Sequence, residues 1–102
     1  MNELILLLRA DADIQAAFER YEEWQEGRGV VFLRHLEAAL ALLRTHPEIA
    51  PPFKHGHRRL LVAGFPFGIF YSIHGNRIIV AGVADLRQDP AAILRRLGFR
   101  RM

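Results

Sequence analysis

Arginine is the residue type in this sequence best able to bind an anion, and it is unevenly distributed. Residues 54–102 hold nine basic and two acidic side chains, a net charge of +7, whereas residues 1–53 hold five arginines and nine acids, a net charge of −4. The split indicates two surfaces with different partners, and the basic one favours nucleic acid or an acidic protein segment. The candidates for contact with a target are Arg58, Arg77, Arg87, Arg95 and Arg96.

Histidines and glutamates offer two other kinds of chemistry. His55 and His57 have the spacing of a metal-binding pair, with His46 or His74 as a third ligand, but no Asp, Glu or Cys lies nearby at ligand spacing. A group of glutamates could supply an acid/base pair, but it falls on the polar side of a helical stretch, which favours a solvated face. This group consists of Glu19, Glu22, Glu23 and Glu26. The sequence therefore predicts no catalytic residues, no metal and no cofactor.

Aromatic residues could read single-stranded nucleic acid or anchor a protein partner. Phe67, Phe70 and Tyr71 could stack on bases, although aromatics on an alternating strand are more often core. A second set lies on the apolar stripe of the first helical stretch and could anchor a partner, since interface hot spots favour tryptophan. This second set, the candidates for contact with a partner protein, is Phe18, Tyr21 and Trp24.

Length and composition limit the kind of protein that these residues can belong to. A chain of 102 residues corresponds to one domain, 1–102. The absence of cysteine excludes disulfides and fits a cytoplasmic location. The apolar runs are too short to span a bilayer. We therefore expect a small cytoplasmic protein without a membrane partner.

The first half of the chain predicts a strand followed by two helices. Residues 4–8 are short and apolar and predict a strand, and Asp11 or Asp13 supplies the N-cap of the helix that follows. Gly27 and Gly29 break this helix, and a second one starts near Val30 and ends before Pro47. Two helices with a short break form a helical hairpin.

The second half predicts three strands and a short helix. Residues 58–63, 67–74 and 77–84 have strand patterns, and Gly75-Asn76 fits a two-residue hairpin loop. Asp89 caps a last helix whose first residue is Pro90. We expect an α+β domain with the helices on one face of the sheet: an N-terminal strand at an edge or paired with a distant strand, a helical hairpin, an antiparallel meander and a C-terminal helix.

This order of elements, with several local patterns, resembles the RelE/ParE toxins of type II toxin–antitoxin modules, and most closely the ParE-like branch. The patterns are 27–33 (GRGVVFL), 36–40 (LEAAL), 47–49 (PEI), 58–61 (RRLL), 65–71 (FPFGIFY) and 83–90 (VADLRQDP). The last is similar to a terminal-strand pattern of valine, small residue, histidine, any residue, arginine, arginine, any residue, proline. The resemblance covers nearly the whole chain and implies the fold expected above.

The chain departs from this family at several positions that matter for activity. In RelE-type ribosome-dependent ribonucleases, arginines on these strands and a tyrosine in the last helix help to cleave mRNA. Here Arg87 is kept, but Gly68 replaces a basic residue, Asp85 the histidine, Gln88 the second basic residue and Ile93 the tyrosine. RNA cleavage needs a group that activates the 2′-hydroxyl, which Arg87 alone cannot provide.

The resemblance therefore implies a toxin of the ParE type. Such a toxin inhibits DNA gyrase, and thus replication, without enzymatic chemistry, and a cognate antitoxin neutralises it in a hetero-oligomeric complex that binds DNA through the antitoxin. Two alternatives remain open: a RelE-like mRNA endonuclease, and a remnant without a target that binds only its antitoxin.

Overall fold

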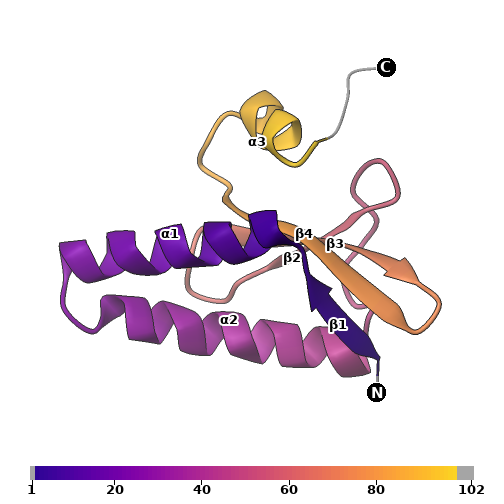
Figure 1. Ribbon diagram of the computed structural model, residues 1–102, viewed down its shortest axis with the longest axis horizontal. Coiled ribbons are helices and arrows are strands. Elements are labelled where there is room, and N and C mark those ends of the chain that lie inside the picture. The colour runs from indigo at the N-terminus through magenta and orange to yellow at the C-terminus, as the bar shows by residue number, and fades with distance from the viewer. Residues whose placement is uncertain (1, 99–102) are drawn as a thin grey trace.

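The computed structural model describes residues 2–98 and has a single α+β fold (Figure 1). Its elements follow the predicted order: β1 (Glu3–Leu6), α1 (Leu8–Trp24), α2 (Arg28–Thr45), β2 (Arg58–Leu61), β3 (Phe67–His74), β4 (Arg77–Asp85) and α3 (Pro90–Arg96). None of the helices in this part of the chain is long and apolar enough to cross a membrane.

The start of α1 differs from the expectation. The strand ends at Leu6 and the helix begins at Leu8, without a side-chain cap, so neither Asp11 nor Asp13 is the N-cap. Asp11 lies in the first turn, where a carboxylate favours the helix dipole. Asp13 lies further along the helix and accepts a hydrogen bond from the backbone N–H of Val83 at 2.9 Å. The local pattern predicted Asp11 or Asp13 as the helix cap, but the Asp13 carboxylate instead makes a tertiary contact with β4.

The sheet has the strand order β1-β4-β3-β2. The last three strands form the predicted antiparallel meander, and β1 lies at an edge, parallel to β4. The edge position of β1 and its pairing with a distant strand confirm the prediction, because parallel neighbours need a long crossover, which here is the rest of the domain. Strand β4 is thus central, with a neighbouring strand on each side.

Helices cover both faces of this sheet. The hairpin of α1 and α2 packs on one face, over a core that contains Phe32, Leu36, Ile69 and Tyr71. The expectation of helices on one face holds for this pair only, because α3 covers the opposite face (Figure 1). There Ile93 and Leu97 pack with Phe70 and two alanines of β4, and both are almost fully buried.

Two glycines and a glutamate shape the turn between α1 and α2. Gly27 has φ 86°, a left-handed conformation that suits glycine, and α2 begins immediately after it, two residues before the predicted Val30. Gly29 lies inside α2 where a Cβ would approach the carbonyl oxygen of Phe18 to 2.7 Å, so the helices meet too closely for any larger residue. Glu22 accepts hydrogen bonds from the backbone N–H groups of Gly27 at 3.1 Å and Gly29 at 2.7 Å.

The position of α3 against the sheet depends on a second close approach, between Gly82 of β4 and the side chain of Leu97. The β3–β4 register shifts between Phe70 and Tyr71, so Gly82 lies opposite Phe70 and faces α3. A Cβ on Gly82 would overlap Cδ2 of Leu97 and come within 3.1 Å of Oδ2 of Asp13. The absence of a side chain at this one position on β4 therefore allows α3 to lie against the sheet.

We expect Gly82→Ala to destabilise the fold by about 1–3 kcal/mol, because the added methyl group overpacks the α3 interface. Chemical denaturation would measure the loss. In a Leu97→Ala background the same substitution should cost less, since the clashing side chain is absent, and a double-mutant cycle gives the difference. Equal costs in the two backgrounds would contradict this account of α3 packing.

Candidate interaction surfaces

The predicted target-binding arginines do not converge on one site. Arg58 is half-buried on β2, where its Nη1 donates to the carbonyl oxygen of Ala50 at 2.6 Å. Arg58 and Arg59 lie on opposite faces of the sheet, because side chains alternate along a strand. Arg59 faces the α3 side and stacks over Phe53 at 4.8 Å. Arg58 therefore stabilises the loop after α2 through this hydrogen bond, and its guanidinium group is not fully exposed to solvent.

Arg77 and Arg96 form ion pairs within the protein. Arg77 pairs with Glu3 at 3.2 Å, with both side chains more than half exposed, so this contact adds little stability. Arg96 pairs with Asp13 at 3.2 Å, and the Asp13 side chain is only 8% exposed. Burial raises the pKa of Asp13, and the amide of Val83 and the charge of Arg96 oppose this rise. Arg95 is exposed at the end of α3, and Arg100 and Arg101 lie outside the described residues.

Arg87 is exposed but held in one orientation by Asp85. One carboxylate oxygen of Asp85 accepts from the backbone N–H of Arg87 at 2.9 Å and from its Nε at 3.0 Å, and the other accepts from Nη2 at 2.7 Å. The Asp85 side chain is 9% exposed, whereas that of Arg87 is 72% exposed. The hydrogen bond from the Arg87 side chain is the main cause that lowers the pKa of Asp85. The aspartate in the family's histidine position thus orients the neighbouring guanidinium.

Tyr21 lies beside this pair, with its ring in an aromatic cluster. The ring centroid lies 5.4 Å from Phe32, 5.2 Å from Phe65 and 6.1 Å from Phe67. Burial raises the pKa of the hydroxyl, and the charge of Arg87 opposes that rise. At neutral pH Tyr21 is therefore protonated, which suits a hydrogen-bond donor better than a general base.

The three predicted partner-binding residues differ in exposure. Phe18 packs against Gly29 of α2, and Tyr21 is half-buried in the aromatic cluster, so both are engaged in packing within the domain. Trp24 is 71% exposed at the last residue of α1. The guanidinium of Arg28 lies 5.8 Å from the centroid of the Trp24 ring and 5.0 Å from that of Phe65. Trp24 is thus the member of the set that a partner can reach most easily.

The remaining sequence candidates behave as packing or surface residues. Phe67, Phe70 and Tyr71 are at most 5% exposed, so they belong to the core and cannot stack on bases. Within residues 2–98 no group of three His, Cys, Asp or Glu side chains could hold a metal ion. Of the four glutamates, Glu22 caps the turn before α2, and the amide of Gly27 is the main cause that lowers its pKa.

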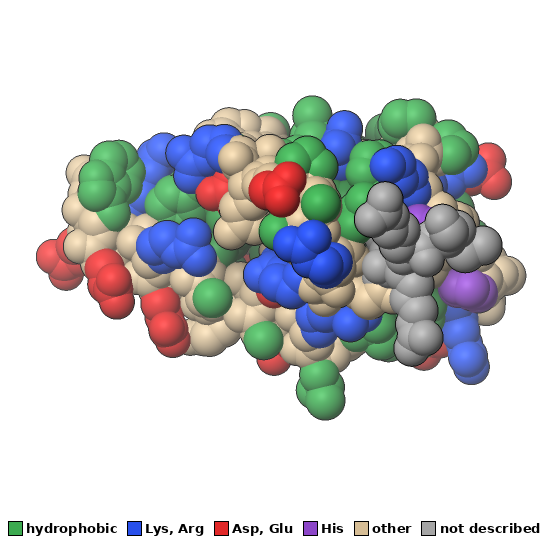
Figure 2. All heavy atoms as spheres, turned by 90° about the horizontal axis from the view of Figure 1, so that it is seen from above, with side chains coloured by type: hydrophobic (Ala, Val, Ile, Leu, Met, Phe, Trp, Pro, Cys, Tyr) green, Lys and Arg blue, Asp and Glu red, His purple; other side chains and the backbone are tan. Residues whose placement is uncertain are grey.

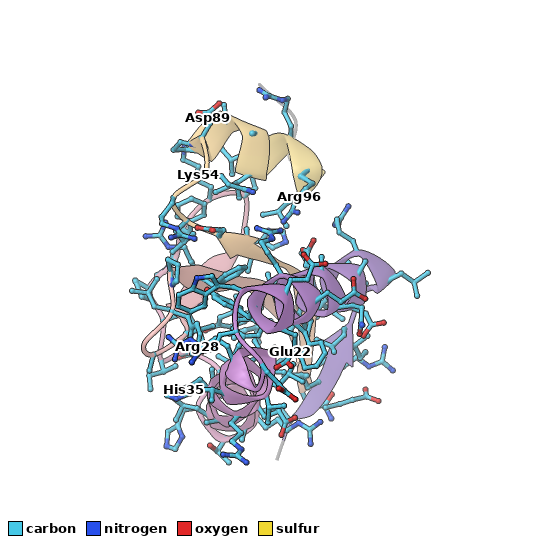
Figure 3. All side chains as sticks on the ribbon, turned by 90° about the vertical axis from the view of Figure 1, so that its left-hand side faces the viewer. Glu22, Arg28, His35, Lys54, Asp89 and Arg96 are labelled. Carbon is cyan, nitrogen blue, oxygen red and sulfur yellow. The ribbon has the colours of Figure 1, made fainter. Side chains whose placement is uncertain are left out.

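Four residues with notable contacts, Arg28, Phe65, Asp13 and Arg59, have no functional role that their sequence pattern predicts. Arg28 stood out only as a residue between two glycines, and its contact with Phe65 joins segments far apart in the chain. Figure 2 shows Lys and Arg side chains spread over the face that carries α3, with some acidic side chains grouped at one end and others between the basic ones. In Figure 3 Lys54 and Arg96 lie near α3, while Arg28 lies lower, beside the helical hairpin. Basic side chains therefore lie both near α3 and at the hairpin.

The Asp85–Arg87 contact predicts a pH dependence. The folded pKa of Asp85 lies below its ordinary value of 3.8, so the contact stabilises the fold above that pH and is lost as the pH falls. The stability difference between the wild type and Asp85→Asn should therefore shrink between about pH 7 and about pH 3 in urea titrations. Asp13 affects both proteins equally and cancels. A difference that stays constant or grows would contradict this role.

Comparison with known proteins agrees with the fold. A family model described as the ParE toxin of the type II toxin–antitoxin system, parDE, matches residues 4–90. No curated protein matches the chain significantly.

Solved structures with this architecture include the chromosomal ParDE TA system from P. aeruginosa, with a TM-score of 0.75 and 18% identity over 84% of this chain and 97% of the other. YafQ from E. coli strain BL21(DE3) has a TM-score of 0.63 and 14% identity over 91% and 98% of the two chains. At these identities the structures show a shared fold, whereas the family model covers most of the sequence. The chain therefore belongs to the ParE toxins of type II toxin–antitoxin systems.

Proposed function

We propose that this chain is a ParE-like toxin that inhibits DNA gyrase in the cytoplasm by binding and is neutralised by a cognate antitoxin. The observation that carries this proposal is the family match over residues 4–90, together with a ParDE-like fold. Membership of a toxin family is the reason to propose that the chain acts within a toxin–antitoxin module. The choice of gyrase rests on the resemblance to ParE toxins, and the choice of binding over RNA cleavage rests on the chemistry near Arg87.

The end of β4 favours binding over RNA cleavage. Cleavage needs a base for the 2′-hydroxyl as well as cations for the developing charge. The carboxylate of Asp85 is engaged by Arg87, and the raised pKa of Tyr21 makes its hydroxyl a poor base. Gly68 has no side chain, and a Cβ there would lie 3.1 Å from Cγ of Arg59. Ile93, in the position of the family's tyrosine, is buried in the core under α3.

Exposure divides the five arginines proposed to contact the target. Arg58 is half-buried and donates to a carbonyl oxygen, and Arg77 and Arg96 form ion pairs with Glu3 and Asp13. Arg87 is also paired, with Asp85, but its side chain is 72% exposed, and Arg95 is exposed at the end of α3. We assign target contact chiefly to these two, with Arg87 held in a fixed orientation that lowers the entropy lost on binding.

The antitoxin is proposed to wrap the chain with an acidic segment that orders on binding. Such a segment can cover a large surface, and its charge would match the +7 of residues 54–102. Trp24 gives it an apolar anchor at the tip of the helical hairpin.

Expression of the chain without its antitoxin should arrest growth, with DNA breaks and an induced DNA-damage response, because a poisoned gyrase leaves cleaved DNA. Primer extension on ribosome-bound messages should show no codon-specific cuts in the same cells. Co-expression of the protein encoded by the adjacent reading frame should restore growth.

The two alternatives give different results in this experiment. Message cuts that disappear in Arg87→Ala would establish the endonuclease and contradict the gyrase proposal. Normal growth, with intact DNA and message despite soluble toxin, would indicate a remnant that only binds its antitoxin.

Trp24→Ala should weaken antitoxin binding about tenfold or more, as expected for an interface tryptophan. Because the side chain is 71% exposed, the loss of folding stability should stay below about 0.5 kcal/mol. Calorimetric titration would measure the affinity. Val30→Ala, which truncates another exposed apolar residue, is the matched control. Unchanged affinity in Trp24→Ala would remove the anchor from the proposal.

A further inference from the structure

The tip of the helical hairpin carries an arginine with an unusual environment. Arg28, the first residue of α2, lies over the rings of Trp24 and Phe65, which together with Arg28 we call the hairpin-tip site. Its Nε is buried and has no hydrogen-bond partner within residues 2–98. A buried donor without a partner costs free energy, and an acceptor recovers that cost once the Arg28 side chain turns to bring Nε to the surface. The Arg28 guanidinium can therefore donate to a hydrogen-bond acceptor that residues 2–98 do not supply.

Further positive charge surrounds this position. The charges of Arg87, Arg28 and Arg20 all act on the Tyr21 hydroxyl, although burial is the larger influence on its pKa. These arginines come from α1, α2 and the segment after β4, so the fold brings together cations that are distant in sequence. Asp85, the acid that also acts on Tyr21, is engaged by Arg87. Arg87 and Asp85 offset each other, and the charges of Arg28 and Arg20 remain to attract an anion.

The carboxylate of Glu22 does not fill this role. Its two oxygens accept from the amides of Gly27, Gly29 and Val30 at 3.1, 2.7 and 3.4 Å. In Figure 3, which looks onto the hairpin end, Arg28 and His35 lie on one side and Glu22 on the other. The described part of the chain provides no ion pair to Arg28.

The surroundings favour the carboxylate of a polypeptide over a nucleic acid. Glu23 and Glu26 are exposed beside Trp24 in sequence and would repel an extended polyanion. Phe65 already contacts Tyr21, Phe32, His35 and Arg28, so it offers no free face to a base. A single carboxylate next to an apolar side chain fits this site better than a polyanion or a base does. The carboxylate can pair with Arg28 while the apolar neighbour packs on Trp24.

We propose that the hairpin-tip site binds an Asp or Glu side chain of the antitoxin, with an adjacent apolar residue of the antitoxin on Trp24. This inference rests on the proposed function for the existence of the antitoxin and adds the group that is recognised. Arg28 is then the specificity-determining contact. Trp24 and Phe65 fix the orientation of its planar guanidinium group, so that it can make a bidentate contact with the carboxylate.

The test compares Arg28→Met with Arg34→Met. Methionine keeps an unbranched apolar side chain against Trp24 and Phe65 but removes the charge, and Arg34 is an exposed arginine on the same helix. The full-length variants are titrated with the protein encoded by the adjacent reading frame. Arg28→Met should bind about 10- to 100-fold more weakly and with a smaller salt dependence, and Arg34→Met should bind nearly as the wild type does. Equal affinities in the two variants would overturn the proposal.

Three further arms make the result specific. Arg28→Lys keeps the charge without the planar fork and should lose part of the affinity, which gives a readout even if Arg28→Met folds poorly. Arg28→Glu should regain binding with one acid-to-lysine variant of the antitoxin, and failure of every such variant would overturn the proposal. A labelled single-stranded oligonucleotide should bind the wild type and Arg28→Met equally, and a selective loss there would assign the site to nucleic acid instead. If the wild type binds no protein from the adjacent frame, the proposed function itself fails, and this inference fails with it.

Discussion

Burial of β4 on both faces is the constraint on which the rest of the structure depends. The strand has a neighbouring strand on each side and a helical layer on each face. The two faces therefore need side chains of different size. Val80 and Val83 fill the space under α1 and α2, whereas small residues face α3. Asp13 then joins the layers, since it accepts from the β4 backbone and pairs with Arg96 of α3. The end of β4 is thereby fixed, and with it the place of Asp85 and Arg87.

The charge asymmetry of the sequence has two separate consequences in the fold. Part of the positive charge stabilises the domain, as the contacts of Arg58 and Arg96 show. Another part remains accessible, at Arg87 near the sheet end and at Arg28 on the hairpin tip. Net charge therefore overstated the basic surface that a partner can use, because the exposure of each guanidinium group, and not charge alone, decides which ones remain available.

The sequence predicted the order of elements, the meander and the helical hairpin, because periodicity and glycine or proline boundaries are local properties. It missed the start of α1, since the role of Asp13 depends on an amide that is 70 residues away. It also placed the helices on one face, although α3 lies on the other, because an apolar stripe does not reveal which face of a sheet it covers. The hairpin-tip site escaped prediction for a similar reason: Phe65 and Arg28 meet only in the folded chain.

We propose that this ParE-family chain acts by binding gyrase and not by catalysis. Titration of a fixed amount of purified gyrase with the purified chain in a DNA supercoiling assay tests this proposal most directly. Inhibition should follow the molar ratio of the two proteins, should not grow with incubation time and should be reversed by the antitoxin. Loss of supercoiling that grows with time at a trace amount of toxin, or no inhibition at a molar excess, would contradict it.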